Sequence, residues 1–351
     1  MTRFMISSGP VIALLSAALF GASTPFAKLL LGDGLDIWLL AGLLYLGSGL
    51  GLLVVWIIHS RKQDEARLAR ADWGWMGLIV LAGGVAGPVL LMTGLATTPA
   101  STAALLLNVE GLATMGIAWL VLHEHVDRRL LAGAIAILAG ALVLSWKGGA
   151  SSIGWGALAI VGACIAWGID NNLTRKLSGS DPVQIAMVKG LVAGGVNLVL
   201  GLTHGAHLPD LTTIAEAGLV GFLGYGISLV LFVLALRHLG SARTGAYFSS
   251  APFIGALIAI VLLGDPVTLR LIAAAVLMVI GLYLHLAEKH DHSHIHEPME
   301  HVHAHVHDEH HRHEHSPDDP SGEPHSHVHA HMRLVHAHPH YPDLHHRHAH
   351  S

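Results

Sequence analysis

Long apolar stretches separated by short polar breaks run from residue 9 to residue 287. A helix needs about 20 apolar residues to cross the hydrocarbon core of a bilayer. The pattern therefore predicts an all-α membrane protein with ten transmembrane helices. The expected spans are 9–31, 37–58, 73–95, 99–122, 129–147, 153–175, 182–203, 213–236, 242–263 and 267–287.

Two segments of the first half have counterparts in the second half. Phe20–Leu30 aligns with Trp167–Leu177 at an offset of 147, and Val121–Leu130 aligns with Leu262–Leu271 at an offset of 141. Five spans per half is an odd number, so the pattern predicts two inverted five-helix repeats. Because the first apolar stretch has a counterpart, we interpret it as a span and not as a cleaved signal peptide. The expected domains are 1–147, 148–288 and a C-terminal tail over 289–351.

The positive charges predict the orientation of the spans. Short cytoplasmic loops of membrane proteins collect Lys and Arg. With the N-terminus inside, twelve Lys and Arg residues fall on the inner side, and only Lys28, Lys147 and Arg270 fall on the outer side. We therefore expect a multi-pass protein of the cytoplasmic (inner) membrane with both termini in the cytoplasm.

The composition agrees with a membrane protein and excludes several other classes. The chain is 52% hydrophobic and 12% charged, about half the charged fraction of a soluble domain. No basic patch suggests nucleic acid, and the single cysteine, Cys164, rules out a disulfide framework. Neither a nucleophile–base pair nor a phosphate loop indicates an enzyme. The expected partners are the lipid bilayer and a small-molecule or cation substrate, and a homodimer is left open.

An ordered set of features over residues 9–287 resembles the EamA family of the drug/metabolite transporter superfamily. One departure is Glu110-Gly111, which stands where the family often has a mid-helix proline, matched in the second half by Pro252. The resemblance implies a permease of the cytoplasmic membrane, commonly an exporter of small metabolites, amino acids or drugs. The matching residues are Phe20-Gly21, Lys28, Trp167-Gly168, Glu124, Asp265, Gly133 to Gly140, and Gly281.

Polar side chains inside the expected spans are the candidates for a transport site. A charge at the centre of a membrane helix costs about 2.5–3.5 kcal/mol on insertion scales, so such residues face protein or water. We predict that a substrate or coupling cavity between the halves includes several of them. The candidates are Asn108, Glu110, Asp170, Asn171, Asn172, Lys189 and Asn197.

These candidates each allow a structural interpretation as well. Glu110 either couples transport to a proton or cation, or forms a buried ion pair with Lys189. Asp170-Asn171-Asn172 occupies three successive helical positions, which cannot all face one cavity on a regular helix. Either part of it faces the cavity, or the helix is unwound there, or the three residues form a polar network between helices.

Glycine and acidic residues near the helix ends receive structural interpretations. Small residues let membrane helices approach closely, which we expect at Gly190-x-x-x-Gly194. Gly87-Pro88 is the expected hinge, because proline removes a backbone hydrogen bond. Glu124 and Asp265 are expected to anchor tight turns.

The tail carries 23 of the 30 histidines, and residues 288–351 have a net charge of −7 with histidine neutral. It has no apolar periodicity, so it is expected to be disordered. Repeated His-x-His suits Zn²⁺, Ni²⁺, Co²⁺ or Cu²⁺, although no cofactor is required for the expected function. The metal could be buffered or sensed, the tail could respond to pH, or it could have no role. The expected ligands are His301, His303, His305, His307, His325, His327, His329 and His331.

The sequence thus favours a secondary transporter that moves a small solute, and the family it resembles implies an exporter of metabolites or drugs. Two alternatives stay open. One is a divalent transition-metal transporter with the tail as a metal buffer or sensor. The other is a membrane protein that senses metal or pH through the tail and transports nothing.

Overall fold

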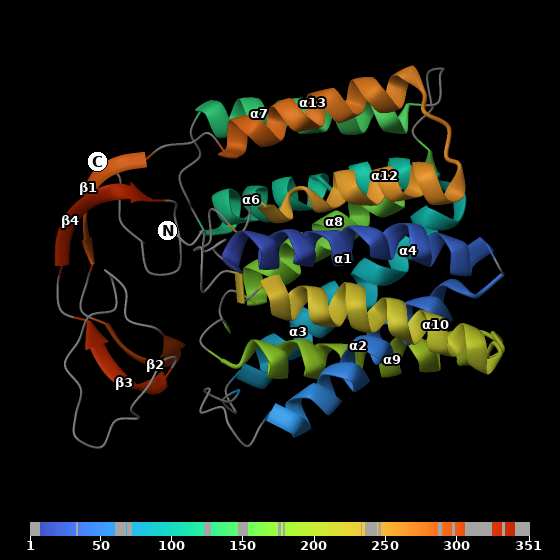
Figure 1. Ribbon diagram of the computed structural model, residues 1–351, viewed down its shortest axis with the longest axis horizontal. Helices are drawn as coiled ribbons and strands as arrows, with labels where there is room; N and C mark the ends of the chain where they lie inside the picture. Colours follow the sequence, from blue (N-terminus) through green and yellow to red (C-terminus); the bar gives the residue numbers. More distant parts are fainter. Residues whose placement is uncertain are drawn as a thin grey trace, which may run out of the picture.

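The computed structural model shows a bundle of roughly parallel helices with a small region of strands beside one end (Figure 1). All further statements concern the residues that it describes. These are 8–32, 34–59, 68, 72–122, 128–146, 154–174, 177, 180–232, 234–235, 244, 247–286, 290–296, 299–305, 325–331 and 334–340.

Two of the helical segments in the bundle have π-helical geometry, and each of them continues an α-helix. The first follows α3 and leads into α4, and the second follows α10. The elements of the bundle are α1 (Ser8–Gly32), α2 (Ile37–His59), α3 (Trp73–Ile79), η2 (Val80–Ala86), α4 (Gly87–Thr97), α5 (Ala100–Leu106), α6 (Val109–Leu122), α7 (Arg128–Ser145), α8 (Trp155–Thr174), α9 (Pro182–Thr203), α10 (Leu211–Gly221), η4 (Phe222–Ile227), α12 (Ala251–Leu263) and α13 (Leu269–Leu286).

Eight helical stretches in the described part of the chain are long and apolar enough to cross a membrane. They correspond to the first eight predicted spans. The last two predicted spans appear as shorter apolar helices, Ala251–Leu263 and Leu269–Leu284. The structure thus confirms a helical protein with many candidate membrane spans, and the count of ten stays a prediction.

Large apolar side chains cover the outside of the bundle, and glycines allow close helix packing at some contacts inside it. Large apolar residues such as Leu81, Leu120 and Val121 are more than 60% exposed, as expected for a surface that faces lipid tails. Between α2 and α9, in contrast, glycine lets the two backbones touch. A Cβ added at Gly190 would lie 2.7 Å from the Gly49 nitrogen. The expected close approach at Gly190-x-x-x-Gly194 is therefore present.

Helices from opposite halves of the sequence pack against each other throughout the bundle. The pairs α1 with α12, α6 with α8, α2 with α9, and α7 with α13 all join the two halves. The last pair runs along one edge of the bundle (Figure 1), where a Cβ at Gly281 would lie 2.6 Å from the Gly133 carbonyl oxygen. Neither half has a separate core, so the polar residues at the centre lie between the halves.

The described segments of the tail form strands where the sequence predicts disorder. β1 (His290–His296) pairs antiparallel with β4 (Leu334–His340), and β2 (Met299–His305) pairs antiparallel with β3 (His325–His331). Strict alternation of His with other residues has the period of two that a strand requires. The disorder expected of the tail stays a prediction.

Candidate functional site

Pro88 creates a gap in the hydrogen bonds of the third span. Proline has no backbone N–H, so it cannot donate to the carbonyl of Gly84 four residues earlier. One residue before it, the Gly87 amide donates to Ala82, five residues back, and not to Gly83. The π-helix η2 therefore leaves the carbonyls of Gly83 and Gly84 without their usual helical partners.

Side chains from three other helices satisfy these two carbonyls. The Tyr45 hydroxyl on α2 and the Trp167 indole on α8 both donate to the Gly83 oxygen, at 2.7 and 3.0 Å. Asn197 on α9, which is fully buried, donates its amide to the Gly84 oxygen at 2.9 Å. An unpaired carbonyl in this apolar interior would cost several kcal/mol. These contacts hold the irregular turn that the sequence indicates as a hinge.

The fourth span is interrupted just before Glu110. α5 ends at Leu106 and α6 begins at Val109, with a turn between them in which the Asn108 amide bonds to the Leu105 carbonyl. Glu110 therefore lies in the first turn of α6 and not in the middle of a continuous helix, as the sequence analysis expected. The partial positive charge of a helix N-terminus stabilises a carboxylate at this position.

A hydrogen-bonded group joins α6 to α8 around Glu110. The Asn171 amide donates to Glu110 Oε1 at 3.0 Å and to Thr114 Oγ1 at 3.2 Å. Its neighbour Asn172 donates to the backbone carbonyls of Thr114 and Gly168. Asn172 therefore fastens the two helices together, whereas Asn171 is exposed and contacts the carboxylate.

Lys189 pairs with Asp170, which corrects the expected alternative of a Glu110–Lys189 pair. The Lys189 ammonium of α9 donates to Asp170 Oδ2 on α8, and the Thr174 hydroxyl donates to Asp170 Oδ1 at 3.2 Å. Asp170 is 4% exposed. Within the described part of the chain, Glu110 has no salt-bridge partner. Because α8 is a continuous helix here, the alternative of an unwound helix at Asp170 does not hold.

Two of the predicted site residues donate to partners other than the carboxylates. Asn108 donates to the Leu105 carbonyl and contacts the Met278 sulfur on α13, and Asn197 binds η2 as described above. Conversely, Thr114 and Thr174 belong to the group but were missed. Each lies four residues after a candidate carboxylate, so helical periodicity alone identifies them as neighbours.

Two charged residues near helix ends bind the backbone of another helix, whereas Asp265 was expected to anchor a tight turn. Asp265 accepts the backbone N–H of Ser101 at 2.7 Å and so caps the start of α5. At the opposite end of a helix, the Lys28 ammonium donates to the carbonyls of Leu95 and Ala96 near the end of α4. Glu124 lies outside the described residues.

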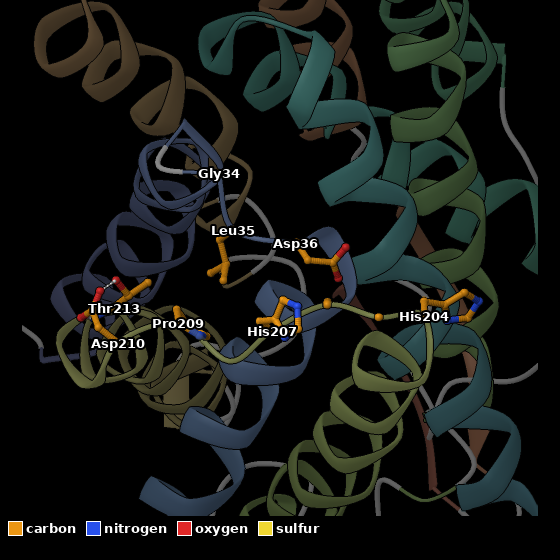
Figure 2. A pocket seen from close by; sticks show the side chains of 10 residues that line it. Gly34, Leu35, Asp36, His204, His207, Pro209, Asp210 and Thr213 are labelled. Carbon is orange, nitrogen blue, oxygen red and sulfur yellow. Dashed lines mark hydrogen bonds between the residues drawn. The ribbon is translucent and has the colours of Figure 1, made fainter.

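A surface cavity of about 530 Å³ lies between the α1–α2 and α9–α10 connections (Figure 2). Its acidic residues serve as helix caps: Asp36 accepts the amides of Trp38 and Leu39, and Asp210 accepts those of Thr212 and Thr213. The Thr213 amide is the main cause that lowers the pKa of Asp210. The cavity shares no lining residue with the Glu110 group, so we do not regard it as the transport site.

The described side chains give no metal centre, since no group of three or more His, Cys, Asp and Glu among them could hold a metal ion. The predicted tail ligands are not part of that set. His307 lies outside the described residues, and for the other seven histidines the structure describes only the backbone.

The model of the EamA-like transporter family matches the chain twice, over residues 7–146 and 154–287. The chain belongs to the EamA-like transporter family. The two matches cover the helical bundle and confirm the resemblance found in the sequence. In this EamA-like chain the polar group around Glu110 is contributed by both matched copies.

Known proteins similar to this EamA-like chain include transporters with different descriptions. An uncharacterized transporter of Methanothermobacter thermautotrophicus is 30% identical over 235 residues, which is 65% of this chain and 68% of that protein. A probable terminal-alkyne amino-acid exporter of Streptantibioticus cattleyicolor is 27% identical over 248 residues, covering 69% and 82%. A solved protein crystal structure superposes with a TM-score of 0.60 at 18% identity, over 80% of this chain and 96% of the other. This last likeness shows the fold alone.

Proposed function

We propose that the protein is a secondary transporter of the cytoplasmic membrane that exports a small amine-bearing or zwitterionic solute, such as an amino acid. Family membership supports transport, and the exporter from S. cattleyicolor supports the substrate class. The local charge supports it as well. Glu110 and the Asp170–Lys189 pair together carry one net negative charge, which attracts an ammonium group.

We further propose that the two halves are inverted repeats with the site at their interface. Irregular helical segments recur at matching positions. The π-helix Val80–Ala86 corresponds to Phe222–Ile227, and the turn before Glu110 corresponds to the turn before Ala251. Discontinuous helices at equivalent positions of two repeats are typical of binding sites in secondary transporters.

Contacts between the halves support the same arrangement. Gly83 packs so closely against Asp170 that a Cβ would overlap it, and Gly224 packs in the same way against Ser23. Both pairs follow the sequence offsets of 141 and 147. The resemblance of the contacts implies that each half presents the same surface to the other.

One observation carries the proposed mechanism: Glu110 is a carboxylate at the break of a membrane helix, hydrogen-bonded to the neutral amide of Asn171. With no cation partner among the described residues, it is free to bind either a proton or the ammonium group of a substrate. Because Glu110 binds either a proton or the substrate but not both at once, export of the solute is coupled to uptake of a proton. Asn171 keeps the carboxylate in place in both states.

The test replaces Glu110 by Gln, which keeps an oxygen that accepts from Asn171 but removes the charge. Purified protein in proteoliposomes is loaded with radiolabelled amino acids, and efflux is measured with and without a pH gradient. We expect a pH gradient to change the efflux rate of the wild type. In Glu110→Gln this change should be at least about tenfold smaller, which corresponds to about 1.4 kcal/mol of coupling. Glu216→Gln on α10 is the matched control, because Glu216 is exposed.

Solute efflux by the wild type excludes a protein that only senses metal or pH. If none of the amino acids is moved, the proposed substrate class is wrong. If Glu110→Gln responds to the gradient as the wild type does, transport stands but Glu110 has no part in coupling.

A further inference from the structure

The two strands β2 and β3 bring histidines directly opposite each other. In the antiparallel register, His301 pairs with His329, His303 pairs with His327, and His305 pairs with His325. No histidine of β2 is opposite another residue type. Since the proposed transport site lies wholly within the helices, this arrangement is independent of it.

The register places all three pairs on one face of the two-stranded ribbon. Directly opposed residues of an antiparallel pair share a face, and so do residues two apart along one strand. The residues between the histidines, such as Val302 and Val328, occupy the other face. One face therefore carries six histidines in three successive rows, and the opposite face carries Val302, Val328, Ala304, Ser326, Glu300 and Ala330.

The spacing of these rows, and not only the number of histidines, favours the binding of a metal ion. Opposed residues have Cβ atoms about 4.5–5.5 Å apart, and the next row follows after about 6.6 Å along the strand. Two adjacent rows thus place four histidine positions within a small area of the ribbon. Neutral imidazole is a favoured ligand of Zn²⁺, Ni²⁺, Co²⁺ and Cu²⁺.

We propose that the histidine face of β2 and β3 is a binding site for a divalent transition-metal ion. Two adjacent rows, His301 with His329 and His303 with His327, form its centre. The ion bridges two strands that are separated by 19 residues of sequence, from 306 to 324, and therefore favours their pairing. Metal binding and ribbon formation are then a single linked equilibrium.

The decisive variant moves histidines without changing their number. Full-length protein carrying H325S/S326H, H327V/V328H and H329A/A330H has the same composition, but three histidines move to the opposite face from those of β2. All proteins in the comparison also carry H336A/H338A, because β1 and β4 have opposed histidines of their own. Zn²⁺ affinity is measured in detergent by competition with a chromogenic chelator, and Co²⁺ absorption reports nitrogen coordination.

We expect the rearranged protein to bind Zn²⁺ at least tenfold more weakly than the parent and to lose the Co²⁺ spectrum of the tight site. The quadruple variant H301A/H303A/H327A/H329A should show the same loss. A matched variant, H310A/H311A/H313A/H315A, removes equally many histidines between the strands and should bind like the parent. Equal binding by the parent and the rearranged protein would overturn the proposal, because affinity would then follow histidine number only. Equal loss in both quadruple variants, or no tight binding in the parent, would overturn it as well.

Discussion

At the scale of single residues, Lys189 of α9 forms an ion pair with Asp170 of α8, and the Glu110 carboxylate of α6 accepts the neutral amide of Asn171. Glu110, Asp170 and Lys189 were recognisable because a charge within an apolar stretch is costly. Their partners depend on how α6, α8 and α9 are rotated about their axes, and that rotation is set by packing. Lys189 lies nearer to Asp170 for this reason, which leaves Glu110 with the amide of Asn171.

The Asp170–Lys189 pair is expected to behave as a buried ion pair. Removing one partner leaves an uncompensated charge in the bundle, at a cost of about 3–5 kcal/mol. Asp170→Asn and Lys189→Met should each lower the unfolding temperature in detergent clearly. The double variant should be more stable than either single variant, because no isolated charge remains. Additive losses in the double variant would show that the two groups do not depend on each other.

At the scale of helical elements, the irregular turn η2 is a compromise between Pro88 and the surrounding helices. The sequence indicated a hinge at Gly87-Pro88 because proline lacks a donor. It could not show that the turn would widen into a π-helix, nor that Tyr45, Trp167 and Asn197 would supply the missing donors. These residues are distant in sequence, and only the folded bundle brings them together.

Asn197 is expected to stabilise the fold because Pro88 cannot donate a hydrogen bond to the Gly84 carbonyl. Asn197→Leu leaves the Gly84 carbonyl unpaired, which should cost about 1–3 kcal/mol of stability. In a Pro88→Ala background the new backbone N–H can donate to Gly84, so the same substitution should cost less. Thermal unfolding of the four proteins measures this coupling. An equal cost of Asn197→Leu in both backgrounds would contradict the role given to Pro88.

Close packing of α2 on α9 yields a prediction with an internal control. Gly190→Ala should separate the two helices, since its Cβ would lie 2.7 Å from the Gly49 nitrogen. Gly195→Ala on the same helix meets nothing within 4 Å and should be neutral or slightly stabilising, because alanine favours the helix. Size-exclusion profiles and unfolding temperatures distinguish the two. Similar behaviour of both variants would show that the contact has little energetic weight.

At the scale of the whole molecule, hydropathy predicted the first eight spans because the bilayer fixes the length of a helix. It failed where a span is interrupted without proline or glycine, as at Leu107 and Asn108 before Glu110. Hydropathy also does not predict which helices of one half pack against which helices of the other. Internal similarity in the sequence was the only indication of it.

The proposed inverted arrangement requires both ends of the chain to lie on the cytoplasmic side. Reporter fusions before residue 8 and after residue 286, one active only in the cytoplasm and one active only outside, test this directly. We expect both positions to give the cytoplasmic signal, because the inner loops carry most of the Lys and Arg. Opposite signals would require an odd number of spans and would exclude the arrangement.

The matching contacts of Gly83 with Asp170 and of Gly224 with Ser23 differ in one respect. One interface holds an ionised group and the other a hydroxyl, although both derive from equivalent positions in the two copies. Two inverted copies of identical sequence would present the same chemistry to both sides of a membrane. Here the interface at Asp170 carries a charged pair and the interface at Ser23 a neutral hydroxyl, so the two proposed routes to the site differ chemically.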